Sequence, residues 1–322
     1  MRVGRHRRFA LLVSSLYGAA LLSSCGGTAP APAGGGNPVS GGQPISPMPS
    51  VPQRSFVVMV IEENHAYEQV IGSPSMPYLN TLAQQGALAT QYYANAHPSI
   101  GNYFALTTGA VQTNDNNFPG PVSSDNLVRE LVASGKTWKV YAEDLPSPGY
   151  LGGSVGNYEK HHNPFAYFSD VVSNASQAAN IVPFSQWIND LNAGALPDLA
   201  FVLPNNIDDC HSCPVGTVCS DNELLGRADQ WLKTTVAPLL SSTQFQSSGL
   251  LLITFDESNI ADVRNGGGRV PLIAFGAKAR SGAQSTATYR HENTLKSVCS
   301  VLALAACPVA SSVVPEDDLI QH

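Results

Sequence analysis

Uninterrupted apolar runs of strand length, separated by segments with helical spacing, constrain the fold of this chain most strongly. Residues 57–61 read Val-Val-Met-Val-Ile and residues 250–253 read Leu-Leu-Leu-Ile, with no polar residue alternating between the apolar ones. Strands of this kind are buried on both faces, which requires a largely parallel sheet covered by helices on each side. The sequence therefore predicts an α/β domain with a mostly parallel central sheet.

The positions of the individual elements follow from the same periodicities. Strands are expected over residues 56–61, 138–141, 199–203, 250–255 and 270–275, and helices over residues 76–85, 100–108, 126–134, 222–240 and 291–303. No internal repeat and no second linker interrupts residues 55–322, so this stretch is predicted to be one domain. In a parallel sheet, ligands bind at the carboxyl ends of the strands.

The N-terminal residues differ in composition from the rest of the chain. Four arginines within residues 2–8 precede an apolar stretch that is short for a membrane span, which predicts a secretory signal peptide over residues 1–24. Cys25 ends a segment that resembles a bacterial lipobox, so we expect an exported lipoprotein anchored to the membrane through Cys25, facing the periplasm or the cell exterior. A secreted protein without an anchor is the alternative. Residues 25–54 are rich in Pro and Gly and are expected to form a disordered tether.

The charge balance excludes one class of partner. The formal net charge is −7, and removal of the predicted signal peptide with its four arginines would change it to −11. A protein this acidic is not built to bind nucleic acid by neutralising backbone phosphates. Any phosphate that it handles must be met by a localised site, which we expect to include a bound cation.

Cysteine usage is typical of an exported protein. If Cys25 is lipidated, five cysteines remain: Cys210, Cys213, Cys219, Cys299 and Cys307. The last two could close a loop at the end of the last expected helix. For the other three, a short loop pinned by a disulfide is favoured over a zinc site, and the pairing is left open.

Acidic residues follow two of the expected strands. Glu62 and Glu63 come directly after the first strand, and Asp256 and Glu257 come directly after the fourth. Carboxylates that converge on one edge of a sheet repel one another and lose hydration, so a cation is the natural compensation. Each cluster taken by itself could equally be solvated or could cap a helix.

Ser99 stands where a β-rich segment ends and the helix over residues 100–108 is expected to begin. A hydroxyl at that place lies at the positive end of the helix dipole, beside free backbone N–H groups. An enzyme places a nucleophile that receives a phosphoryl group in this setting. The alternative is a helix N-cap, which is the more frequent role of an isolated serine.

Eight short motifs, in this order along the chain, resemble those of the bacterial phosphoesterase family. They are Glu63-Asn64-His65-x-Tyr67, His97-Pro98-Ser99-x-x-Asn102-Tyr103, Tyr158 with His162-Asn163-Pro164-Phe165, Pro204-Asn205 with Asp209-x-His211, Asp229-x-Trp231-Leu232, Thr254-Phe255-Asp256-Glu257, Arg269-Val270-Pro271 and Tyr289-x-His291. The family includes secreted acid phosphatases and phosphatidylinositol 3-phosphatase-like enzymes, and its longer relatives are phospholipases C. Because the family belongs to the alkaline phosphatase superfamily, the resemblance implies a three-layer α/β/α sandwich.

The resemblance also implies a nucleophile and a metal site. Ser99 is the expected nucleophile, and one divalent ion is expected on Glu63, Asn64, Ser99, Asp256 and Glu257. These ligands are mostly carboxylate and amide oxygens, which favour a hard ion such as Ca²⁺, Mg²⁺ or Mn²⁺ over Zn²⁺. A cation beside Ser99 would lower the pKa of its hydroxyl, and attack on phosphate would give a phosphoserine that water then hydrolyses.

Six further side chains in these motifs have expected roles. The candidates for protonating the leaving alkoxide are His162, His211 and His291. Asn102, about one turn into its helix, and His97 are expected to contact the substrate phosphate. Asp209 could orient the ring of His211 or cap the loop that carries it.

The sequence thus predicts metal-dependent hydrolysis of phosphate monoesters, as in acid phosphatases, on a phosphorylated small molecule or a phospholipid such as a phosphoinositide. Phospholipase C-type diester cleavage is the first alternative, which the compact domain disfavours because it lacks the long extension of those relatives. A non-catalytic surface lipoprotein that binds a ligand is the second. A binding module would not need both a hydroxyl nucleophile and candidate proton donors.

Overall fold

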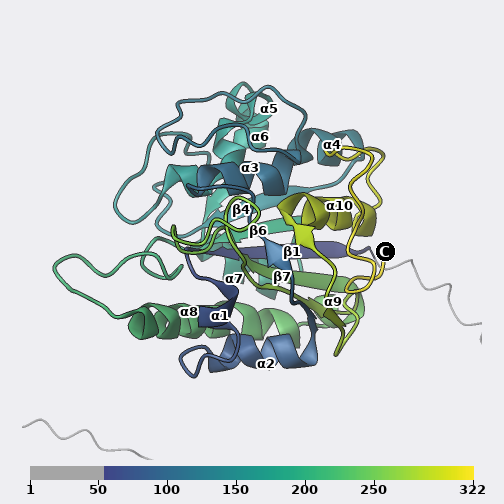
Figure 1. Cartoon of the computed structure of the whole chain (residues 1–322). Helices are drawn as coiled ribbons and strands as arrows, with labels where there is room; N and C mark the ends of the chain where they lie inside the picture. Colours follow the sequence, from purple (N-terminus) through teal and green to yellow (C-terminus); the bar gives the residue numbers. More distant parts are fainter. Residues whose placement is uncertain (1–53) are drawn as a thin grey trace, which may run out of the picture. The chain divides into compact units, whose positions relative to one another are not determined.

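The computed structural model describes residues 54–322 and has a central eight-stranded sheet in the order β5-β4-β6-β1-β7-β8-β2-β9 (Figure 1). Its strands are β1 (Phe56–Glu62), β2 (Ala87–Ala89), β4 (Trp138–Ala142), β5 (Ile181–Pro183), β6 (Leu199–Leu203), β7 (Gly249–Phe255), β8 (Leu272–Gly276) and β9 (Gln284–Ser285). The five strands from β5 to β7 run parallel, and β8 is antiparallel to both of its neighbours. Two short strands, β3 (Tyr92–Tyr93) and β10 (Tyr289–Arg290), pair separately.

Helices cover both faces of the sheet, which confirms the predicted three-layer sandwich. Figure 1 shows α3 (Ile100–Thr108), α4 (Leu127–Ala133) and α10 (His291–Val301) on one face, and α2 (Pro77–Gln85), α8 (Asp221–Ser241) and α9 (Thr243–Ser248) on the other. The remaining helical segments are α1 (Tyr67–Val70), α5 (Ser169–Val172), α6 (Ala175–Ala178), α7 (Ser185–Asn192) and the 3₁₀ turns η1 (Lys160–His162) and η2 (Pro164–Tyr167).

The central strands are buried along their whole length, as the apolar runs predict. All seven residues of β1 and all seven of β7 are buried. The structure differs from the prediction in small ways: β1 extends to Glu62, which therefore belongs to the strand, and β8 begins only at Leu272. Ten strands and α-helices of residues 54–322 were not predicted, and most of them have only two to four residues, too few to show a periodicity. They are strands β2, β3, β5, β9 and β10 and helices α1, α5, α6, α7 and α9.

The predicted signal peptide, Cys25 and nearly all of the predicted tether lie outside the described residues, so these expectations remain predictions. Among residues 54–322, no helix combines the length and the apolar character needed to cross a bilayer.

Candidate active site

Three loops bring acidic residues to one edge of the sheet, at the carboxyl ends of its parallel strands. Glu63 follows β1, Asp256 and Glu257 follow β7, and Asp209 lies in the long segment between β6 and α8. Backbone hydrogen bonds join these loops: the N–H of Glu63 donates to the carbonyl of Asp209 (2.8 Å), and the N–H of Asp256 donates to the carbonyl of Glu62 (2.9 Å). The parallel register thus gathers carboxylates from segments far apart in the sequence.

These four carboxylates are almost completely buried, with exposed fractions of 0% for Glu63, 1% for Asp209, 0% for Asp256 and 4% for Glu257. Within residues 54–322 their only ion-pair partners are two histidine side chains. Burial raises the pKa of Glu63 and Asp209 well above the usual range, and it raises the pKa of Asp256 to about 7 and that of Glu257 to about 9. Such a cluster is stable in its ionised form only beside a positive charge.

Ser99 occupies the N-cap position of α3 and is 3% exposed, but its side chain makes no capping hydrogen bond. Instead its hydroxyl donates to Oε2 of Glu63 (3.2 Å). Hydrogen bonding by Ser99 also lowers the pKa of Asp256 and Glu257, against the larger effect of burial. The hydroxyl therefore faces the acidic cluster and does not act as a helix cap.

The turn in front of Ser99 is held by Asn102, one turn into α3. Its Oδ1 accepts the N–H groups of Asn95 (2.8 Å) and Ala96 (3.0 Å), and its Nδ2 donates to the carbonyl of Ala96 (2.9 Å). The same Nδ2 lies 3.5 Å from Oε2 of Glu257. Asn102 thus orders the backbone before the serine, and one of its N–H groups faces the acidic cluster.

His97 has contacts at both ring nitrogens. Its Nδ1 lies 2.8 Å from Oε2 of Glu257, and its Nε2 lies 3.0 Å from the backbone carbonyl of Asp262. The ring is therefore fixed between the acidic cluster and the loop that follows β7. This geometry orients the Glu257 carboxylate.

His291, the first residue of α10, is also held from two sides. Its Nδ1 lies 2.9 Å from the hydroxyl of Tyr92, and its Nε2 lies 2.6 Å from the backbone carbonyl of Asp256. The carbonyl is an acceptor, so Nε2 carries a proton and Nδ1 accepts from the tyrosine. Burial lowers the pKa of His291 to about 4, which keeps the ring neutral at ordinary pH.

His162, at the end of η1, lies directly beside Glu63. Its ring stacks on Tyr103 with centroids 5.2 Å apart and planes 12° from parallel. Its Nε2 is 3.2 Å from Oε1 of Glu63, and its Nδ1 is 3.5 Å from Oδ2 of Asp209. The hydroxyl of Tyr103 donates to the same Oε1 of Glu63 (2.6 Å). Tyr103 therefore positions both groups, a role that its place four residues after Ser99, on the same helix face, could have indicated.

Two overlapping groups of residues could hold a cation here. One oxygen or nitrogen from each of Glu63, His162 and Asp209 lies within 4.8 Å of the others. On the other side of Glu63, the backbone N–H of Asn64 donates to Oδ1 of Asp256 (3.3 Å) and Asn64 Nδ2 donates to Oε2 of Glu63 (3.4 Å). The second carboxylate oxygens of Asp256 and Asp209 are buried without a hydrogen-bond partner. Asp209 was not predicted to be a ligand.

His211 lies on the loop after Asp209 and is exposed to solvent. The N–H of His211 donates to Oδ1 of Asp209 (2.8 Å), whereas its ring Nδ1 lies 2.9 Å from the hydroxyl of Ser212. Asp209 therefore caps the loop, as one of the two expected alternatives proposed, and does not orient the His211 ring. A disulfide in the same segment confirms the predicted disulfide-pinned loop, and it joins Cys213 to Cys219, a pairing that the sequence left open.

The other cysteines also follow the sequence analysis. Cys299 and Cys307 form the second disulfide, at the end of α10. Cys210 is the one free thiol among residues 54–322, and it is buried. Burial and the neighbouring carboxylates raise its pKa well above the usual value, so it is held as a neutral thiol.

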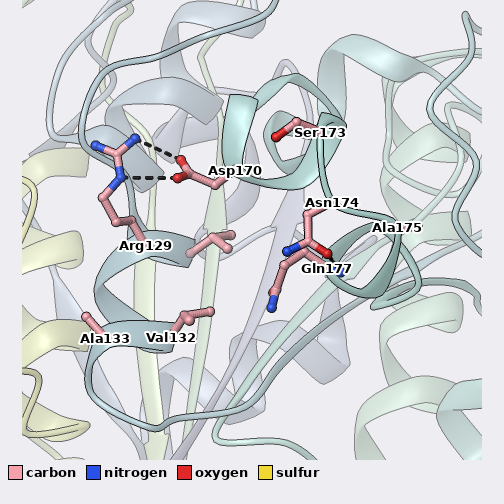
Figure 2. A pocket seen from close by; sticks show the side chains of 9 residues that line it. Arg129, Val132, Ala133, Asp170, Ser173, Asn174, Ala175 and Gln177 are labelled. Atoms are coloured by element: carbon pink, nitrogen blue, oxygen red, sulfur yellow. Dashed lines mark hydrogen bonds and ion pairs between the residues drawn. The ribbon is translucent and has the colours of Figure 1, made fainter.

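A pocket of ≈ 650 Å³ lies elsewhere, between α4 and the segment of α5 and α6, and it contains none of the expected site residues. Figure 2 shows that its one arginine, Arg129, is engaged by the carboxylate of Asp170, with distances of 3.3 and 2.9 Å. The charge of Arg129 in this pocket is therefore already paired.

Known proteins resemble this chain in sequence and in fold. A sequence model of the phosphoesterase family matches residues 73–304. A phosphatidylinositol-3-phosphatase of Mycobacterium tuberculosis is 32% identical over 84% of this chain and 84% of its own length. An acid phosphatase of Aspergillus fumigatus is 31% identical over 80% of this chain, which spans 57% of that longer relative.

Solved structures with low sequence identity share the fold. An alkaline phosphatase superfamily protein from Vibrio parahaemolyticus superposes with a TM-score of 0.58 at 15% identity, covering 82% of this chain and 69% of that one. The lipoteichoic acid synthase LtaP from Listeria monocytogenes superposes with a TM-score of 0.59 at 10% identity, covering 83% of this chain and 76% of that one. With the fold of the alkaline phosphatase superfamily and a sequence match over most of its length, the chain belongs to the phosphoesterase family.

Proposed function

We propose that this chain is a phosphoric monoester hydrolase of the acid phosphatase kind, with Ser99 as its nucleophile. The observation that carries the proposal is the Ser99 hydroxyl, which is buried at a helix N-terminus yet donates to Glu63 and does not cap the helix. The family and its phosphatase relatives support the monoester class. The substrate is a phosphorylated small molecule or a phospholipid headgroup.

The residues at the sheet edge fit one hard divalent cation, held by Glu63, Asn64, Ser99, Asp256 and Glu257. The buried, unpartnered Oδ2 of Asp256 and the excess of carboxylates over cationic side chains support this fit. When bound, such an ion lowers the pKa of a hydroxyl ligand and neutralises charge on phosphate. An all-oxygen donor set favours Ca²⁺, Mg²⁺ or Mn²⁺ over Zn²⁺.

The group of Glu63, His162 and Asp209 is an alternative position for the ion, and it includes an imidazole ligand. We favour the first set because it contains Ser99, whose hydroxyl the ion must activate. His162 is then available to move a proton. Because burial lowers the pKa of His162 well below the usual value, its ring is neutral in the free protein and must take up a proton before it can give one to the leaving oxygen. The metal content of a His162→Ala variant distinguishes the two arrangements. It falls if His162 is a ligand, and it is unchanged if the ion is held by the first set.

The chemical steps need few groups. The Ser99 hydroxyl gives its proton to the Glu63 carboxylate to which it is hydrogen-bonded, and Oγ bonds to phosphorus while the bond to the leaving oxygen breaks. The leaving oxygen takes a proton from His162 or His211, and Glu63 returns its proton to Oγ when the phosphoserine is later cleaved. Water then cleaves the phosphoserine, and the same imidazole accepts the proton of the water. Tyr103 and Asp209 fix the His162 ring on two sides.

The remaining side chains position these groups. In this proposal His97 orients the Glu257 carboxylate. His291, which is neutral and hydrogen-bonded to the backbone carbonyl of Asp256, holds the loop of Asp256 in place. The N–H of Asn102 that faces Glu257 is the group that would donate to a phosphate oxygen.

The two disulfides among the described residues support an exported protein. We propose that it is held at the membrane through Cys25, on the periplasmic or external side. Incorporation of a radiolabelled fatty acid tests this, with Cys25→Ser as the negative control.

Hydrolysis of p-nitrophenyl phosphate and p-nitrophenylphosphorylcholine by the wild type, Ser99→Ala and Ser248→Ala tests the reaction. Ser248 is a buried serine whose hydroxyl donates to the backbone of Arg54, so this variant controls for loss of a buried hydroxyl. We expect Ser99→Ala to lose at least ~10³-fold in monoester turnover, and Ser248→Ala to retain it. Unchanged turnover by Ser99→Ala rejects the nucleophile. Turnover of the diester alone indicates a phospholipase C-type enzyme, and turnover of neither ester by the wild type indicates a binding protein.

A further inference from the structure

The most exposed large aliphatic side chains of residues 54–322 lie on two loops. Val215 and Val218 are 96% and 97% exposed, and Ile260 and Val263 are 72% and 68% exposed. The next in order, Val314, is 58% exposed. Single exposed aliphatic residues need no explanation, but four of this degree on two neighbouring loops indicate a surface that contacts something apolar. We call the two loops, residues 210–220 and 258–268, the rim.

The rim is continuous along the chain with the candidate active site. Its first loop begins directly after Asp209 and its second directly after Glu257, so both extend from the acidic cluster. The side chain of Gln69 joins their bases, because its Nε2 donates to Asp221 (3.2 Å) and its Oε1 accepts from Asn259 (3.3 Å). In Figure 1 the long segment between β6 and α8 stands out from the edge of the sheet.

Few charges oppose transfer of the rim out of water. Residues 210–220 contain no Asp, Glu, Lys or Arg, although the whole chain has a net charge of −7. In the second loop, Arg264 pairs with Asp262 (2.6 Å), and Arg269, just beyond it, pairs with Glu68 (2.9 Å). Unpaired charges would have to be desolvated at a high cost, and the rim has none to desolvate. The Cys213–Cys219 disulfide restricts the first loop in advance, so the loop would lose less conformational entropy on docking.

We propose that the rim inserts its four aliphatic side chains into the surface of a phospholipid bilayer and thereby presents the site to a phosphate monoester in a lipid headgroup. The identity of this substrate rests on the proposed function, whereas the docking itself does not. A bilayer fits better than a protein partner, because protein-binding surfaces rely on Tyr, Trp and Arg anchors in a packed core. The exposed anchors here are Val and Ile on protruding loops, which suit shallow insertion among acyl chains.

A tryptophan reporter tests the docking in the full chain. Val218→Trp places the reporter on the rim, and Val132→Trp places it on α4, where Val132 is 48% exposed beside the pocket of Figure 2. The three native tryptophans are buried and give a constant background. With phosphatidylcholine vesicles that contain brominated lipid, we expect a blue shift and quenching for Val218→Trp alone. An anchor at Cys25 would hold both variants at the bilayer equally, so only insertion of the loop distinguishes them.

A pair of double variants tests the consequence for activity. Val215→Ser with Val218→Ser removes two rim anchors, and Val132→Ser with Val172→Ser removes two valines that are 48% and 45% exposed, on α4 and α5. We expect the rim variant to lose about tenfold in kcat/KM on a phosphatidylinositol monophosphate in vesicles, while turnover of p-nitrophenyl phosphate is unchanged. The control variant should retain both activities.

Three outcomes overturn the docking. The first is Val218→Trp emission that vesicles do not change, as expected if the rim binds a protein instead. The second is an equal loss on both substrates by the rim variant, because the loops then act on the site itself. The third is unchanged vesicle activity of that variant. If the wild type hydrolyses neither substrate, the proposed function fails, but the fluorescence result still decides the docking.

Discussion

The hydroxyl of Ser99 lies 3.2 Å from Oε2 of Glu63, so the N-terminus of α3 meets the residue that follows β1. The other oxygen of the same carboxylate accepts from Tyr103, one turn further along α3 (2.6 Å). One helix face therefore supplies two donors to one buried carboxylate. Changes at Glu63 should act on the serine, on the tyrosine and on cation binding together.

Replacement of Glu63 by Gln keeps its size but removes its charge. We expect loss of bound divalent metal and a fall in monoester turnover of at least ~10²-fold, because the cation then loses a ligand and Ser99 its charged partner. Glu62→Gln is the matched control: Glu62 is also fully buried, but both of its oxygens are unpartnered. Metal analysis and kinetics of the two variants check this. Equal losses in both variants would show that turnover depends on any buried acid at this edge and not on Glu63 in particular.

The protein without divalent ions should lose stability as the pH rises. Burial raises the pKa of Asp256 to about 7 and that of Glu257 to about 9, both above their unfolded values. The folded state therefore binds more protons than the unfolded state, and the associated stability, complete below about pH 4, is lost as the pH passes through the folded pKa values. The buried histidines with lowered pKa, His162 and His291, titrate below pH 7 in both states, so the carboxyls dominate above it. Because one pKa unit corresponds to about 1.4 kcal/mol, the melting temperature after chelation should fall by at least roughly 2–4 °C between pH 7 and pH 8. Added Ca²⁺ or Mg²⁺ should reverse the fall at pH 8, and a melting temperature that rises with pH would contradict the proposed burial of these acids.

Tyr103→Phe removes the hydrogen bond to Glu63 but keeps the aromatic face that stacks on His162. A hydrogen bond to a charged group contributes about 1.5–3 kcal/mol, so we expect roughly a tenfold loss in kcat beside a modest loss of stability. Tyr141→Phe is the control, because its buried hydroxyl donates to Asp190 (2.7 Å), away from the site. It should lose stability without losing kcat. The same kinetic loss in both variants would exclude a specific effect on Glu63.

His162→Ala should impair substrates according to their leaving groups. p-Nitrophenolate needs little protonation, whereas an alkoxide such as that of glycerol needs a proton, so β-glycerophosphate turnover should fall about tenfold more than p-nitrophenyl phosphate turnover. The metal content should be unchanged. Equal effects on both substrates together with loss of metal would instead assign His162 as a ligand.

Removal of the Cys213–Cys219 disulfide should lower activity while the fold is kept. The ring that it closes, residues 213–219, follows directly after His211 and belongs to the same segment as Asp209, which contacts His162. A double Cys213→Ser, Cys219→Ser variant should lose several-fold in kcat with an intact circular dichroism spectrum. The matching variant at Cys299 and Cys307 should lower stability by about 2 kcal/mol and leave kcat unchanged. Full activity of the first variant would show that the loop needs no disulfide.

The boundaries of the longer strands and helices were largely predictable, and so was the convergence of Glu63 with Asp256 and Glu257. Those residues directly follow long apolar strands, and the carboxyl ends of parallel strands meet at one edge whatever the order of the strands. Asp209 and His162 were harder to place, because they stand on long loops where no periodicity fixes the direction of a side chain. The contact between His162 and Asp209 depends on the path by which the long connections between strands bring these two loops together.

By itself, the sequence determined the α/β class, the place of Ser99 at a helix N-terminus and the acidic ends of β1 and β7, because hydrophobic period and local spacing act within a few residues. Only the tertiary structure decided what each polar side chain does. It turned the Ser99 hydroxyl toward Glu63, placed His291 against the carbonyl of Asp256 and stacked Tyr103 on His162. Hydrogen-bond partners in a buried site are chosen by packing between distant segments, since each buried polar group must find a partner among the few that the fold brings within reach.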